Sequence, residues 1–187
     1  GRSNKSYYEI AESLKITNEI LTSAALHQVP EVINISSQAV YDFLNSETYR
    51  EDHDVSPDTS YAQGKYASEL ITNNLPKINN QTFVTSIRLA SLCGGQPGMD
   101  QDELIAQFVN RVLEKKPINI IGGKQTFEKL DVRDAARAIV ALLEISPKQW
   151  QKIYNVASGN PISILRIAQR AVDIGYDYNG GFLSDIL

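Results

Sequence analysis

Cysteine is nearly absent from this sequence, with Cys93 the one example among 187 residues. A single thiol forms no disulfide within the chain and cannot build a cysteine metal cluster. Disulfide frameworks and thiolate metal sites are therefore excluded. Reduced cysteine fits a reducing compartment, so a cytoplasmic setting is expected.

An excess of positive charge and long apolar runs are also lacking. The chain carries 18 Lys and Arg against 22 Asp and Glu, a formal net charge of −4. This balance predicts no surface for nucleic acid or for an anionic membrane. No apolar run approaches the length of a membrane span, and the first residues do not resemble a signal peptide. With 42% hydrophobic residues, the composition is that of a soluble domain with a real core.

Apolar spacing predicts helices and strands that alternate along the chain. Helices are expected over residues 8–27, 60–75, 100–113, 132–144 and 163–172. Strands are expected over residues 32–35, 83–89, 118–121 and 153–156. Pro76 is expected to end the second helix, and Ser60 with Gln63 has the spacing of a capping box. The polar residues 41–59 predict a loop.

Strands that alternate with helices in this way are typical of α/β proteins with a largely parallel sheet. Ligands of such sheets bind beyond the carboxyl ends of the strands. The loops that follow Ile35 and Leu89 are therefore the predicted places for chemistry.

Tyr61 and Lys65 are four residues apart on a predicted helix, so both side chains project from one face. A cation beside a phenol favours the phenolate, which lets a tyrosine act as general acid or base near neutral pH. The Ser37 hydroxyl, at the end of a predicted strand, would steady the charge on the same substrate oxygen. Two other readings stay open: Tyr61 and Lys65 as a surface helix pair, and Ser36 and Ser37 as groups that satisfy a strand end.

Five segments resemble, in order, motifs of the extended short-chain dehydrogenases, the NAD-dependent epimerase/dehydratase family. They read NISSQAVYD, SPDTSYAQGKYASE, TSIRLASLCGGQPG, KLDVRDAARAIVALLE and IYNVASGNPISILRIAQ. The second is similar to the family's P-x-x-x-Y-x-x-x-K-x-x-x-E pattern, with Pro57, Tyr61, Lys65 and Glu69 in place. These matches run from the first helix to about Ala171, which is nearly the whole chain.

The resemblance implies a role for each matched position. Tyr61 would be the catalytic acid and base, Lys65 would bind the nicotinamide ribose and tune Tyr61, and Ser37 would hold the substrate oxygen. The implied cofactor is NAD or NADP. Its nicotinamide side would be lined by Ser36 and by the loop from Ala90 to Cys93, with Ala90 and Ser91 foremost. Arg88 matches a family arginine and is interpreted as a structural partner at a strand rather than a ligand of substrate.

The implied fold is the C-terminal part of a Rossmann-like, doubly wound parallel sheet with a small substrate-binding subdomain. Residues 1–95 would form the catalytic half, and residues 96–187 the substrate-side subdomain with returning sheet elements. No G-x-x-G-x-x-G phosphate loop follows a strand in this sequence. We therefore expect about three strand–helix units, which would grip the cofactor phosphates, to be missing upstream.

Three departures from the family pattern bear on the substrate. Phe127 stands where nucleotide-sugar epimerases carry an arginine for the substrate diphosphate, and a phenyl ring makes no such contact. Gln38 and Ala39 stand where sugar 4,6-dehydratases carry Asp and Glu, which disfavours dehydration. Ser91 stands where many members have asparagine. A nucleotide-diphosphate sugar is therefore a weaker expectation than a sugar or other hydroxyl or carbonyl compound.

The resulting hypothesis is an NAD(P)-dependent oxidoreductase of the epimerase/dehydratase type that acts on a small molecule through Ser37, Tyr61 and Lys65. Whether it works as an epimerase or as a simple reductase stays open. The alternative is a non-catalytic scaffold that senses NAD(P) or another ligand. The resemblance also implies a homodimer through helices at Ala11–Leu26 and Ala62–Leu75.

Overall fold

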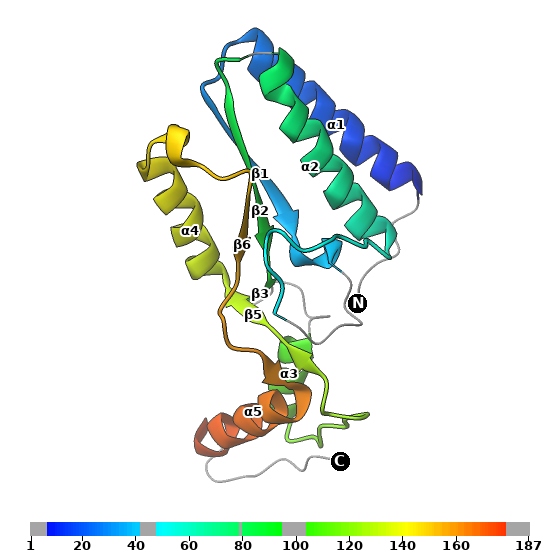
Figure 1. The fold of residues 1–187 in the computed structure, drawn as a ribbon. Coiled ribbons are helices and arrows are strands. Elements are labelled where there is room, and N and C mark those ends of the chain that lie inside the picture. The colour runs from blue at the N-terminus through cyan, green and yellow to red at the C-terminus, as the bar shows by residue number, and fades with distance from the viewer. Residues whose placement is uncertain (1–6, 42–47, 79, 95–103, 179–187) are drawn as a thin grey trace. The chain divides into compact units, whose positions relative to one another are not determined.

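The structure is a computed structural model that describes residues 7–41, 48–78, 80–94 and 104–178 (Figure 1). The chain divides into two compact units, each assembled from two separate segments. The sheet unit comprises residues 2–92 with 133–157, and the small unit comprises residues 93–132 with 158–187. Among the described helices, none has the length and apolar character needed to cross a membrane.

The sheet unit is built on three parallel strands in the order β1-β2-β6. These are β1 (Glu31–Ser37), β2 (Phe83–Leu89) and β6 (Ile153–Val156). In register, Ser37 pairs with Leu89 and Leu89 pairs with Val156. The carboxyl ends of all three strands therefore lie at one edge of the sheet, as the α/β prediction requires.

Helices cover both faces of this sheet. On one face, α1 (Tyr7–Leu26) packs on α2 (Ser60–Ile78), and α2 lies against β1 and β2. On the other face lies α4 (Val132–Glu144) (Figure 1). The 3-10 turns η1 (Gln38–Val40) and η2 (Pro147–Gln149) complete the unit. The arrangement confirms the doubly wound, Rossmann-like class.

The small unit holds two helices and short strands. Its elements are α3 (Leu104–Leu113), β4 (Thr126–Phe127), β5 (Lys129–Asp131), β7 (Ile162–Ser163) and α5 (Ile164–Tyr178). β4 and β7 pair antiparallel. Its core consists of the buried side chains Phe108, Val112, Ile118, Ile167, Ala168 and Val172. The close packing of α3 on α5 is therefore entirely apolar at its centre.

Several sequence predictions are corrected by the structure. Pro76 lies inside α2, which runs to Ile78; in the last turn its missing N–H removes one bond and the helix ends two residues later. Residues 119–121 are irregular, and Ile118 alone makes a strand bridge. Gly122 and Gly123, with φ of 83° and 78°, turn the chain away from an extended path.

Other helix and strand ends also differ from the expected ones. The last helix continues beyond Val172 to Tyr178, although Ser163 caps it as expected through the Arg166 amide at 3.2 Å. The expected start of α3 near Asp100 lies outside the described residues. The two- and three-residue strands β3 (Ser91–Cys93), β4, β5 and β7 were not foreseen, because such lengths carry no readable period.

Candidate active site

Ser37 closes β1 and begins the turn η1. Its Oγ accepts a hydrogen bond from the Ala39 amide at 3.2 Å, so the side chain does cap the strand end. The bond uses only acceptor capacity of the hydroxyl, and the O–H remains a donor. Ser37 is half-buried, which leaves part of its side chain open to solvent. The structural and the catalytic reading of Ser37 are therefore compatible.

Tyr61 and Lys65 lie in the first turns of α2. The Lys65 Nζ is 5.9 Å from the centre of the Tyr61 ring and donates a hydrogen bond to the Ile35 carbonyl at 2.9 Å. The lysine thus joins α2 to the end of β1 while its charge stays beside the phenol. This contact is compatible with both readings of the pair, a catalytic site and a surface helix pair.

Thr59, not Ser60, caps the amino end of α2. The Thr59 Oγ1 accepts from the Ala62 amide at 3.1 Å, as an N-cap threonine does. The Gln63 side chain donates to the Pro57 carbonyl at 3.5 Å instead of closing a capping box with Ser60. The helix begins at Ser60, as expected, but its cap is Thr59 rather than Ser60.

Ala90 and Ser91 follow the end of β2. The Ala90 amide donates to the Val156 carbonyl at 2.9 Å and the residue is buried. Ser91 is half-buried and begins β3. Because β1 and β2 pair in parallel with Ser37 opposite Leu89, these residues continue from the same edge of the sheet as Ser37. The structure thus brings the two predicted loops together.

Ser36 occupies a different environment. Its side chain is buried, and its Oγ donates to the Glu69 Oε1 at 2.5 Å. Glu69 also accepts two bonds from Arg88, from Nε at 3.0 Å and from Nη2 at 2.8 Å. Burial alone lowers the pKa of Arg88, but the hydrogen bonds to Glu69 and Tyr41 outweigh it and hold that pKa above its ordinary value. The interpretation of Arg88 as a structural partner is confirmed.

Tyr41 and Asn155 extend this network, and sequence reasoning gave them no role. Arg88 Nη1 donates to the Tyr41 Oη at 2.7 Å, and the guanidinium carbon lies 4.7 Å from the centre of the Tyr41 ring. The Tyr41 hydroxyl has acceptors at Asn155 Oδ1, 2.9 Å, and at the Arg50 carbonyl, 3.0 Å. Tyr49 stacks on Tyr41 with ring centres 4.7 Å apart. A buried phenol needs partners, and the burial of Tyr41 becomes visible only in the fold.

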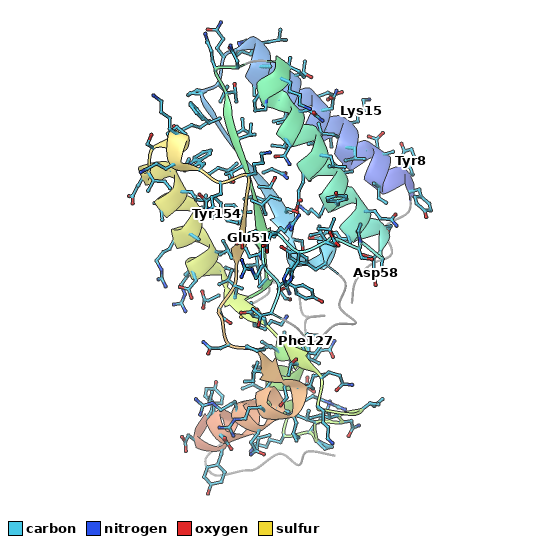
Figure 2. The ribbon with its side chains drawn as sticks, in the orientation of Figure 1. Tyr8, Lys15, Glu51, Asp58, Phe127 and Tyr154 are labelled. Carbon is cyan, nitrogen blue, oxygen red and sulfur yellow. The ribbon has the colours of Figure 1, made fainter. Side chains whose placement is uncertain are left out.

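Phe127, which was expected to lie on the substrate side, belongs to the small unit. Phe127, labelled in Figure 2, is partly exposed on β4 and its backbone pairs with Ile162. The next residue, Glu128, accepts bonds from the Ser158 hydroxyl at 3.2 Å and from the Gly159 amide at 2.5 Å. Its carboxylate thus stabilises a turn of the same unit. In the described part of the chain, no three His, Cys, Asp or Glu side chains are grouped to hold a metal ion.

The chain is similar in sequence to curated proteins. A dTDP-glucose 4,6-dehydratase of an Actinoplanes species is 23% identical over 151 residues, covering 80% of this chain and 46% of the relative. A second, from Streptomyces niveus, is 24% identical over 155 residues, covering 82% and 45%. The chain therefore spans about half the length of these curated relatives.

Solved structures share the fold. The UDP-glucuronic acid 4-epimerase of Bacillus cereus, in complex with UDP-glucuronic acid and NAD, superposes with a TM-score of 0.77 at 23% identity, covering 94% of this chain and 54% of the epimerase. The UDP-N-acetylglucosamine 4-epimerase of Bacillus cereus superposes with a TM-score of 0.81 at 17% identity, covering 100% and 65%. The sequence profile of the NAD dependent epimerase/dehydratase family matches residues 1–157. The chain belongs to that family.

Proposed function

We propose that this chain carries the proton-transfer half of an NAD(P)-dependent enzyme that oxidises or reduces a sugar at one hydroxyl or carbonyl carbon. The observation that carries the proposal is the position of Lys65. Its Nζ lies 5.9 Å from the Tyr61 ring centre and 2.9 Å from the carbonyl oxygen of Ile35, two residues before the end of β1. A fixed cation beside a phenol, at the ligand-binding edge of a parallel sheet, is what acid–base catalysis by tyrosine requires.

The donor set at this edge fits the nicotinamide-ribose end of the cofactor. Lys65 offers an ammonium and Ser91 a half-buried hydroxyl, both suited to ribose oxygens. Ala90, with no polar side chain, can lie beside the apolar face of a ring. When bound, NAD(P) supplies the acceptor or donor of hydride. Nothing in the donor set at this edge chooses between NAD and NADP.

The side chains of this chain handle the proton. Tyr61 Oη gives a proton to the substrate oxygen during reduction and takes one during oxidation. Lys65 stabilises the anionic phenolate that results, because the two charges are held close together. Ser37 donates its O–H to the same substrate oxygen and steadies the charge that develops there. The hydrogen bond that the Ser37 Oγ accepts from the Ala39 amide keeps the serine side chain in place.

Epimerisation or simple reduction fits the site better than dehydration. A dehydratase needs a second acid–base pair, and Gln38 and Ala39 supply no carboxylate after Ser37. The names of the relatives favour a nucleotide-linked sugar as substrate. Phe127 provides no donor to a diphosphate, so we propose that this group is held by other residues or held weakly.

A homodimer is part of the proposal. Ile16 and Ile20 on α1 are 54% and 61% exposed, and Leu70 on α2 is 48% exposed. In a homodimer in which α1 and α2 of one copy pack against α1 and α2 of the other, these side chains would be covered. Sedimentation of the full-length protein tests this, and a monomer at micromolar concentration would contradict it.

The decisive experiment replaces Tyr61 with phenylalanine in the full-length enzyme and measures turnover with a panel of UDP- and dTDP-hexoses. Tyr61→Phe removes the proton donor and keeps the ring, so turnover is expected to fall by about 100-fold or more. Lys65→Met is expected to lower turnover and also to weaken cofactor binding, and Ser37→Ala to lower turnover alone. Tyr66→Phe, on the same helix, is the matched control. Normal turnover in Tyr61→Phe would assign the proton transfer to another group, and a wild-type protein without turnover would leave the non-catalytic, ligand-sensing scaffold as the function.

A further inference from the structure

Glu69 ties three elements together below the candidate site. It is 1% exposed and lies on α2, four residues after Lys65. Its carboxylate accepts from Arg88 of β2 through Nε and Nη2, at 3.0 and 2.8 Å, and from the Ser36 hydroxyl of β1 at 2.5 Å. One side chain therefore fixes the helix that carries Lys65 against the strand end that carries Ser37.

Directional bonds do this work in place of apolar packing. Well-packed hydrophobic side chains of similar volume often replace a buried ion pair without loss of stability. Such side chains would not, however, fix the rotation of α2 about its axis or its position along the strands. The planar fork of paired hydrogen bonds between a guanidinium and a carboxylate does fix both. The fork in Glu69 and Arg88 is complete, since both carboxylate oxygens receive a guanidinium N–H.

The same arginine reaches the chain that leads into α2. Arg88 Nη1 donates to the Tyr41 phenol at 2.7 Å, and the Arg50 carbonyl accepts from that phenol at 3.0 Å. Asn155 bonds to the residues on either side of Arg50. Its side-chain Nδ2 donates to the Tyr49 carbonyl at 3.2 Å, and its backbone N–H donates to Glu51 Oε1 at 2.7 Å. Three consecutive residues, 49–51, are thus anchored to the network; Glu51 is labelled in Figure 2.

We propose that Glu69 and Arg88 are positioning residues, which hold Ser37, Lys65 and the segment 49–51 in the arrangement that turnover needs. Ser36 belongs to this pair as its third member, and its hydroxyl serves Glu69 rather than the nicotinamide. This inference rests on the proposed function. A displacement of about 1 Å in a catalytic group can lower a rate by about 100-fold, so a network that fixes two of the three proposed catalytic residues governs turnover without touching substrate.

Variants of the full-length enzyme separate positioning from mere stability. Glu69→Gln keeps the shape but puts an amide donor against Arg88, and Arg88→Lys keeps the charge but cannot reach Glu69 and Tyr41 together. Thr72→Val is the matched control, because Thr72 is 1% exposed on the same helix and its hydroxyl donates to the Ser68 carbonyl of that helix. Each protein is assayed for kcat and for the KM of the nicotinamide cofactor, with UDP- and dTDP-hexoses as substrates.

The expected result is a fall in kcat of about tenfold or more in Glu69→Gln and Arg88→Lys, with the cofactor KM within about twofold of wild type. Ser36→Ala is expected to lower kcat less and to leave the cofactor KM unchanged. Thr72→Val is expected to keep kcat. Hydrogen exchange of the backbone at 36–41 and 49–51 should rise in Glu69→Gln and Arg88→Lys, and not in Thr72→Val.

Other outcomes would overturn the inference. Wild-type kcat in Glu69→Gln, beside an inactive Tyr61→Phe, removes the positioning role and leaves the proposed function standing. A rise in cofactor KM in Ser36→Ala, with kcat unchanged, assigns Ser36 to the nicotinamide instead. A wild-type enzyme without turnover, whose Tyr61→Phe variant is indistinguishable from it, overturns the proposed function and the positioning role together.

Discussion

Two helices, α2 of the sheet unit and α5 of the small unit, bury different kinds of side chain. In the sheet unit, the face of α2 that meets the strands is largely polar, with Ser68, Glu69 and Thr72 all buried. In the small unit, α5 meets α3 through buried apolar side chains, with Ile167 and Val172 among them. Directional hydrogen bonds thus hold α2 in place, whereas close apolar packing holds α5.

The difference shows which kind of packing fixes an element in a single position. Hydrogen bonds fix the orientation and position of the elements that they join, but burying their polar groups costs desolvation free energy. Removal of one partner leaves the other buried without a hydrogen bond. Apolar contacts carry no such penalty, and their limit is steric fit. The candidate site lies at the start of α2, a helix that directional bonds hold against the sheet, and a site with narrow tolerances needs such fixed positions.

The largest expected effect on stability follows removal of Arg88 from the polar packing. Arg88→Met leaves the Glu69 carboxylate buried without a cation, and losing one partner of a buried pair costs about 3–5 kcal/mol. Urea unfolding followed by the fluorescence of Trp150, the single tryptophan and a residue of the sheet unit, measures the loss. The double variant Glu69→Leu with Arg88→Met should regain most of that stability but not the activity. A double variant as unstable as the single one would contradict this account.

The next effect concerns the apolar packing of the small unit. A Cβ at Gly175 would lie 1.9 Å from Val112 Cγ1, so alanine there has no room. Gly175→Ala should destabilise the chain by about 1–3 kcal/mol, seen in urea unfolding followed by circular dichroism. The companion change Val112→Ala should relieve part of the clash.

Gly64 provides the control for Gly175. A Cβ at Gly64 would lie 3.3 Å from Ile10 Cγ2, the end of a side chain that can shift. Alanine also gains about 1 kcal/mol of helix propensity over glycine. Gly64→Ala should therefore be close to neutral, and a loss equal to that of Gly175→Ala would show that steric fit does not decide the outcome.

Local periodicity accounts for the part of the fold that could be predicted. The bounds of β2 and β6 match the expected strands, and α4 covers the expected helix, because each has enough residues to display its period. The paired Tyr61 and Lys65 followed from helix geometry alone. The sheet end that Lys65 contacts followed from the rule for parallel sheets.

The network around Glu69 could not be predicted, because its members come from four elements far apart in sequence. Glu69 and Arg88 are 19 residues apart, and Tyr41 and Asn155 are 114 apart. Spacing within a helix predicts that Glu69 and Lys65 share one face. It does not predict that Arg88 of β2 lies opposite Glu69. The missing step is tertiary pairing, which single-sequence patterns do not carry.

The smallest expected effect tests exposed ion pairs, one in each unit. The Arg50 guanidinium lowers the pKa of Asp52 in the sheet unit, and the Lys116 ammonium lowers the pKa of Glu114 in the small unit, each chiefly through a hydrogen bond. A carboxyl whose folded pKa is lowered stabilises the fold above its ordinary pKa, and that contribution is lost as the pH falls through the folded pKa. Because these carboxylate side chains are 69% and 54% exposed, solvent screens both pairs.

Asp52→Asn and Glu114→Gln should therefore shift the urea midpoint slightly at neutral pH, and much less than Arg88→Met does. The shift should disappear once the pH is below the folded pKa of each carboxyl, where these groups are protonated in both states, and also in about 1 M salt, where exposed charges are screened. Urea unfolding of each variant beside wild type, at neutral and acidic pH and at both salt concentrations, measures this. A shift at neutral pH as large as that of Arg88→Met would mean that exposed pairs hold the units as firmly as the buried one, and the contrast between directional and apolar packing would lose its basis.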